Sequence, residues 1–152
     1  HHKSLEILKV VLEKRIKFFG ENNSETIESY AEMSEAYKSI GDYNSQFQCI
    51  KKMYEISVRL FKPDSPEVFK AQRALAIGYT WQGFYDKGLE IIKPLSEEVE
   101  LVLGEDNITT IDVLVTYASI LEKKGEYNEV LSLQKDIYER RNRILGENHP
   151  KT

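Results

Sequence analysis

The sequence has few of the residues that most often act in catalysis, bind metals or form disulfides. Its 152 residues include three histidines and one cysteine, Cys49, so no internal disulfide can form and soft metal ligands are few. Cys49 lies among apolar neighbours such as Phe47 and Ile50, which predicts a buried, unreactive thiol. A single unpaired cysteine fits a reducing compartment, and we expect a cytoplasmic location.

The sequence also lacks a basic excess and long apolar runs. Lys and Arg total 21 against 25 Asp and Glu, and the net charge of −4 disfavours nucleic acid, because phosphate binding requires a basic surface. No apolar run approaches the roughly 18 residues of a membrane-spanning helix, so we expect no membrane partner. With 41% hydrophobic and 30% charged residues, the composition predicts a folded chain with a core.

Catalytic and cofactor motifs are missing as well. The sequence has no Gly-rich phosphate loop, no His-Glu-x-x-His motif, and no Ser or Cys with an evident base. His149 has no second ligand at a useful spacing for zinc, and the many carboxylates fit solvated helix surfaces. We therefore expect no enzyme activity, no catalytic residue, no cofactor and no metal site.

What the sequence does contain is a repeat of 42 residues. Gly41, Gly83 and Gly125 recur at this spacing, and each is followed two positions later by a tyrosine. The segments FGENNSETIESY, FKPDSPEVFKAQ and LGEDNITTIDVL superpose without a gap, and LGENHPKT opens a fourth copy. A period of this length indicates a solenoid, in which each unit buries its apolar face against the next.

Each unit is predicted to hold a first helix (A), a tight turn and a second helix (B), because apolar residues recur every three or four positions. The glycine between the helices predicts a left-handed turn, which only glycine adopts without steric cost. Ser65-Pro66-Glu67 is typical of a helix start, while Pro94 is expected to kink a B helix or cost it a hydrogen bond. The predicted helices span residues 3–18, 24–39, 44–60, 66–82, 86–102, 108–124 and 128–144.

The predicted organisation is a single array of about 3.5 repeats over residues 1–152. An array that begins and ends within a repeat lacks end repeats with polar outer faces. We therefore interpret the chain as a fragment of a longer protein. Its predicted parts are an unpaired B helix (3–18), three repeats (19–60, 61–102 and 103–144) and the start of a further repeat (145–152).

The segment ASILEKKGEYNEVLSLQKDIYERRNRILGENHPKT (118–152) resembles the long-loop tetratricopeptide repeats of kinesin light chains and their relatives. Elsewhere in the chain, Ala76 and Tyr79 match the small and aromatic positions of that family's helix A. The resemblance extends over the whole chain. It implies an all-α fold of seven helices, a right-handed superhelical α-solenoid of antiparallel helix pairs. A HEAT-type array is the alternative fold, whereas the helical period disfavours a β-propeller.

The resemblance implies a non-catalytic protein–protein interaction module. Such a scaffold or adaptor binds a partner peptide or helix on a concave face lined by the A helices. Two alternatives stay open, because the same repeat serves many functions. One is a regulatory peptide sensor that controls an effector domain outside this sequence. The other is a structural array that self-associates through its uncapped ends.

The resemblance also implies which charged residues face the concave surface. Glu28, Glu32 and Glu35 share one face of their helix, and Lys70 and Arg73 share a face of the next A helix. A groove that changes from acidic to basic would favour an extended ligand of complementary polarity. The alternative interpretation is a solvated surface whose charges have no partner-binding role.

Trp81, the single tryptophan, is the sharpest of these candidates. It is expected either to stack on a ligand or to pack on the loop around Phe84 and Tyr85. The full set of candidate partner-binding residues is Glu28, Glu32, Glu35, Lys70, Arg73, Ile77, Trp81, Asp112, Thr116 and Ser119.

Overall fold

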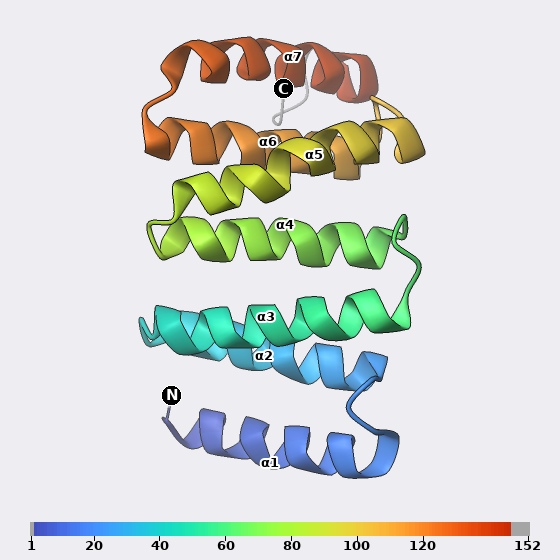
Figure 1. Cartoon of the computed structure of the whole chain (residues 1–152), viewed down its shortest axis with the longest axis vertical. Helices are drawn as coiled ribbons and strands as arrows, with labels where there is room; N and C mark the ends of the chain where they lie inside the picture. Colours follow the sequence, from blue (N-terminus) through green and yellow to red (C-terminus); the bar gives the residue numbers. More distant parts are fainter. Residues whose placement is uncertain (1, 147–152) are drawn as a thin grey trace.

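A computed structural model describes residues 2–146, which form seven α-helices in one stack (Figure 1). No strand occurs in this range, and each helix predicted from the sequence is confirmed to within one residue at either end. His149 and most of the predicted further repeat lie outside the described residues. The helices are α1 (His2–Phe19), α2 (Ser24–Ser39), α3 (Tyr43–Leu60), α4 (Pro66–Trp81), α5 (Tyr85–Leu103), α6 (Ile108–Lys124) and α7 (Tyr127–Leu145).

Each helix packs mainly on the next one along the chain, which is the contact pattern of a solenoid. The chain rises from α1 to α7, its connections alternate between the two edges, and α3 and α5 lie in front of α2 and α6 (Figure 1). Among the A helices, α4 also contacts α6 directly. Within the described residues, by contrast, no Cα atom of α2 lies within 8 Å of a Cα atom of α4. The spacing of the A helices is therefore uneven.

Side-chain caps fix the starts of the A helices at repeat-equivalent positions. Asn23 and Asn107 each accept a hydrogen bond, at 2.9 Å, from a backbone N–H two residues later. Ser65 accepts one from the N–H of Val68 at 3.3 Å, and Pro66 is the first residue of α4, which confirms the predicted helix start. Such a cap typically contributes about 1 kcal/mol to helix stability.

Pro94 lies inside α5, which continues as one helix on both sides of it. Proline has no N–H to donate, so one backbone hydrogen bond is lost there without ending the helix. Pro94 is exposed, and α5 crosses its neighbours obliquely (Figure 1).

Glycine turns join the A and B helices of each repeat. Gly41, Gly83 and Gly125 have φ values of 77°, 80° and 92°, which confirms the predicted left-handed turns. A residue with a Cβ atom is strained in this region whether or not there is room for it.

Replacing Gly83 with valine is expected to lower the free energy of unfolding by about 1 kcal/mol or more, because a β-branched residue resists positive φ. A Cβ added at Gly83 would meet no atom within 4 Å, so the expected cost comes from the backbone conformation rather than from a clash at Cβ. Gly83→Asn is the matched control, because asparagine tolerates the left-handed region. Urea unfolding followed by circular dichroism measures both variants, and a wild-type midpoint for Gly83→Val would contradict the prediction.

The densest part of the core lies where α4, α5 and α6 meet. Phe69 of α4, Leu95 and Val99 of α5, and Val113 of α6 belong to one cluster, and none is more than 1% exposed. This cluster closes the space between α4 and α6. The A helices therefore have a tight junction on one side of α4 and a more open one on the other.

Candidate functional site

Two hollows run between α2 and α4 on the side of the array that carries the A helices. One, of about 330 Å³, lies at the start of the two helices and is lined in part by Glu28 and Lys70. The other, of about 280 Å³, lies toward their ends and is lined in part by Glu35 and Trp81. Met53 of α3 lines both, so they form one continuous groove with α3 as its floor. We call this the α2–α4 groove.

A third hollow, of about 230 Å³, lies between α4 and α6. Ile77 and Trp81 line both this hollow and the α2–α4 groove, so they form the ridge that separates them. Thr116, Ser119 and Lys123 contribute the wall from α6. The structure thus brings together seven of the ten candidate residues around adjoining hollows. They are Glu28, Glu35, Lys70, Ile77, Trp81, Thr116 and Ser119.

The acidic residues of α2 are partly neutralised by neighbours within the fold. A carboxylate oxygen of Glu28 lies 3.5 Å from Nη2 of Arg15, and one of Glu35 lies 3.5 Å from Nζ of Lys38. Glu32 is exposed and has no ion-pair partner within residues 2–146. The α2 wall therefore keeps an acidic character, although a weaker one than the sequence pattern predicts.

The two basic residues that are predicted to face the groove, Lys70 and Arg73, lie in different surroundings. Nη1 of Arg73 donates to the carbonyl of Asp112 at 3.3 Å and lies 4.0 Å from its carboxylate, so this guanidinium links α4 to α6. Lys70 is exposed and lines the α2–α4 groove. Of the two predicted cations, only Lys70 thus belongs to the groove lining.

Trp81 is a half-exposed platform, with 52% of its surface open to solvent. Its ring stacks on Tyr43 at the start of α3, with the centroids 5.8 Å apart and the planes 2° from parallel. Nζ of Lys123 lies 5.3 Å from the centroid of the indole ring. Its aromatic stacking partner is thus Tyr43, from the preceding repeat, and neither of the expected loop residues Phe84 and Tyr85.

Thr116 presents little surface to a partner. It is only 7% exposed, and its hydroxyl donates to the carbonyl of Asp112 at 2.9 Å. Ser119 is exposed at the same hollow. The exposed polar side chains of the α6 wall are therefore mainly those of Ser119 and Lys123. Lys123 is not one of the ten candidate residues.

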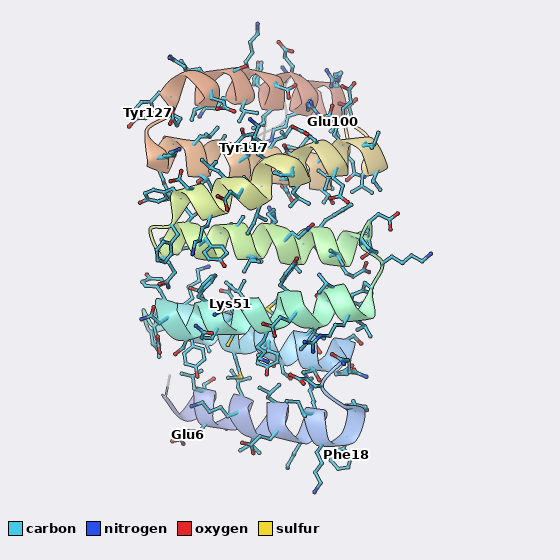
Figure 2. The ribbon with its side chains drawn as sticks, in the orientation of Figure 1. Glu6, Phe18, Lys51, Glu100, Tyr117 and Tyr127 are labelled. Carbon is cyan, nitrogen blue, oxygen red and sulfur yellow. The ribbon has the colours of Figure 1, made fainter. Side chains whose placement is uncertain are left out.

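Sequence reasoning missed a charged cluster that links α7 to the preceding repeat. Arg140, whose side chain is 8% exposed, donates to Asp136 at 2.9 Å, to Glu100 at 3.0 Å and to the carbonyl of Glu105 at 2.9 Å. Glu100, labelled in Figure 2, brings the end of α5 into this cluster. The sequence does carry one signal for this cluster. Arg140 occupies the repeat position at which Ile56 is buried in α3. We interpret the cluster as structural.

The Cys49 thiol is buried, as predicted, with 5% of the residue exposed. Burial raises its pKa from 9.0 to about 11, and the nearby negative charge of Asp42 acts in the same direction. Because the thiol is a weaker acid in the folded chain, its contribution to stability is complete below pH 9. That contribution is lost as the pH rises toward 11.

Cys49 in the folded chain is expected to react with iodoacetamide at pH 8 at least about tenfold more slowly than in urea-unfolded chain, because the thiolate is the nucleophile and is scarce when buried. Mass spectrometry of timed samples measures both rates. Equal rates would show that the thiol is accessible in the native state.

Within residues 2–146, no group of three His, Cys, Asp or Glu side chains is placed to hold a metal ion. None of the seven helices is sufficiently long and apolar to cross a membrane.

Comparison with known proteins identifies the repeat. The tetratricopeptide repeat family matches residues 110–151. Crystal structures of the nearly identical TPR-like repeats of a kinesin light chain candidate from Podosopora anserina superpose on 96% of this chain and share its helix-pair stack. The chain has the fold of a tetratricopeptide-repeat array.

The tetratricopeptide array matches these structures at TM-scores of 0.83 for the original and 0.85 for a single-residue variant of it, with 15% identity and 69% of each matched chain covered. BtubC (BKLC) from P. vanneervenii matches with a TM-score of 0.76 and 14% identity, over 99% of this chain and 60% of that one. No curated protein sequence matches. The resemblance to kinesin-light-chain-type repeats is confirmed, and at this identity the matches establish the fold alone.

Proposed function

We propose that this tetratricopeptide array is a non-catalytic protein-binding module, a scaffold or adaptor segment that receives a peptide or helix from a partner on its A-helix face. Adjoining hollows along α2, α4 and α6, at which seven of the ten candidate residues meet, carry the proposal. Solenoids use their extended surfaces in this way. We expect the module to act in the cytoplasm, where Cys49 stays reduced.

The ridge of Ile77 and Trp81 is the expected energetic centre of binding. Both side chains border two hollows, and a half-exposed indole offers a large rigid surface that a ligand can cover. Lys123 and Lys70 have no ion-pair partner within residues 2–146, and each lines one of the hollows beside apolar surface. The apolar ridge and the two lysines together fit a partner segment that has apolar side chains and a few charged residues.

Selection from a displayed library of random 12-residue peptides tests the proposal. Peptides enriched on the wild-type array are expected to bind Trp81→Ala at least about tenfold more weakly, because burial of large aromatic surface dominates such interfaces. Phe18→Ser is the matched control. Phe18 is 75% exposed and projects from the end of α1, away from the groove (Figure 2).

Affinity is measured by fluorescence anisotropy on variants with wild-type helicity. Peptides that bind Trp81→Ala normally and lose affinity for Phe18→Ser would place binding outside the A-helix face. If no peptide is enriched, the proposal of a peptide-binding module is contradicted.

Self-association is a second candidate, because both end helices expose apolar side chains. In α1, Ile7 is 57% and Val10 is 49% exposed, and in α7, Leu131 is 66% and Tyr138 is 55% exposed. Sedimentation velocity over a hundredfold concentration range tests this role, and a strict monomer would remove it. The third possibility, a regulatory sensor, requires an effector domain outside this sequence.

A further inference from the structure

The larger hollow of the α2–α4 groove is called the socket here. It is the hollow of about 330 Å³ at the start of α2 and α4. The repeat supplies an internal comparison for it, because every lining position has an equivalent 42 residues later. Of the four lining positions whose equivalents are buried one repeat later, three carry smaller side chains in the socket. They are Ile27, Ser57 and Ala71, against Phe69, Val99 and Val113.

The missing side-chain volume explains why the socket is open. One repeat later, Phe69, Val99 and Val113 are 0% exposed within one core cluster, and α4 contacts α6 directly. At the socket, no Cα atom of α2 lies within 8 Å of a Cα atom of α4, and Ile27 remains partly exposed. The space between successive A helices is thus filled by core side chains at the α4–α6 junction and left unfilled at the α2–α4 junction.

An unfilled apolar hollow of this kind favours an apolar guest. Atoms that line a void lack dispersion partners on one side, and an inserted side chain supplies them. Met53 and Phe61 give the socket a largely apolar wall, and the flexible thioether of Met53 adapts its shape to a guest. The volume lies at the lower end of the range for ligand pockets, which suits one side chain rather than a whole small molecule.

The rim of the socket adds a charge preference. Glu28 and Glu67 contribute two carboxylates against the single ammonium group of Lys70. Glu32 continues the acidic wall along α2. Arg15 lies 3.5 Å from Glu28 and partly neutralises it. The acidic character of the rim therefore depends mainly on Glu67 and Glu32, which have no ion-pair partner within residues 2–146. These two carboxylates complement a cation on the partner.

We propose that the socket receives one large apolar side chain, such as phenylalanine, leucine or tryptophan, from a partner peptide that carries lysine or arginine within a few residues of it. This proposal rests on the proposed function and names the chemistry of the partner segment. The socket is the specificity site, and the ridge of Ile77 and Trp81 supports the rest of the peptide.

Methyl NMR tests the socket without a peptide. The chain has two methionines, of which Met53 lines the socket and Met33 is 6% exposed in α2 and does not line it. On titration with toluene, the labelled methyl signal of Met53 is expected to shift and saturate, while that of Met33 stays in place. Equal movement of both signals, or no movement of Met53, would overturn the socket.

The matched control fills the socket with the residues that the next repeat uses. The double variant Ser57→Val with Ala71→Val is expected to keep its helicity, to unfold at an equal or higher temperature, and to lose the Met53 response to toluene. If the double variant misfolds, Ala71→Val alone serves the same purpose. A full toluene response in a folded, filled variant would contradict the proposal.

The peptides selected on the wild-type array then test the partner class. They are expected to share a large apolar residue near Lys or Arg and to bind the filled variant at least about tenfold more weakly. Peptides that bind the filled variant normally but lose affinity for Trp81→Ala would overturn the socket and leave the proposed function standing. Failure to enrich any peptide would overturn the proposed function, and the partner class with it, even where toluene enters the socket.

Discussion

Phe69→Ala is expected to lower the free energy of unfolding by about 4 kcal/mol, because it removes a large, fully buried side chain and leaves a cavity behind. Phe69 is 0% exposed and belongs to the cluster that joins α4, α5 and α6. Leu95, Val99 and Val113 around it are also closely packed, so collapse of the site is limited. The substitution would leave a cavity at the junction of α4 and α6.

Phe84→Ala is the control for this effect. Phe84 is 52% exposed, and Nζ of Lys87 lies 5.1 Å from its ring centroid, so loss of the ring is expected to cost under about 1 kcal/mol. Urea unfolding of both variants, followed by circular dichroism, measures the difference. A similar small cost for both substitutions would contradict the core described here.

Arg140→Met is expected to lower the free energy of unfolding by about 2 kcal/mol, because methionine keeps the apolar stem but loses three charge-assisted hydrogen bonds. The guanidinium joins Asp136 of α7, Glu100 of α5 and the carbonyl of Glu105. The two carboxylates are 41% and 42% exposed, so water can solvate them after the change, and the cost stays below that of a fully buried ion pair.

Arg143→Met is the matched control, three residues along the same helix. Arg143 also reaches the α5–α6 loop, with Nη2 2.6 Å from Asp106, but its side chain is 46% exposed. An exposed ion pair contributes little, so this variant is expected to unfold close to the wild type. Equal destabilisation by both substitutions would show that burial of Arg140 does not decide its contribution.

The helices were predictable because their signals are local. The glycine turns and the Ser65-Pro66 start each act over a few neighbouring residues, the period of 42 residues repeats such signals along the chain, and the structure reproduces them. Pro94 was a local signal too, but the packing of α5 on its neighbours keeps the helix continuous.

The details of the candidate site were less predictable because they depend on contacts between repeats. The stacking of Trp81 on Tyr43 joins successive repeats, and no feature near Trp81 in the sequence indicates it. Likewise, Arg73 was expected to contribute to a basic stretch, whereas its pairing with Asp112 depends on how closely α4 approaches α6.

The socket could be predicted from the sequence only in part. The small residues Ser57 and Ala71 can be read from the sequence once the repeats are superposed. The space left by small side chains can be removed by closer packing of the helices, or it can remain as a hollow. Which of the two occurs depends on the separation of α2 and α4, which only the structure provides.

The most direct test of the account is photo-crosslinking with a selected peptide that carries benzophenone at its large apolar position. We expect crosslinks to residues that line the α2–α4 groove, with Met53 prominent among them because it lines both hollows of the groove. Mass spectrometry maps the attachment sites. Crosslinks confined to the exposed outer faces of α1 or α7, with the groove unmodified, would contradict the claim that this array binds partners on its A-helix face.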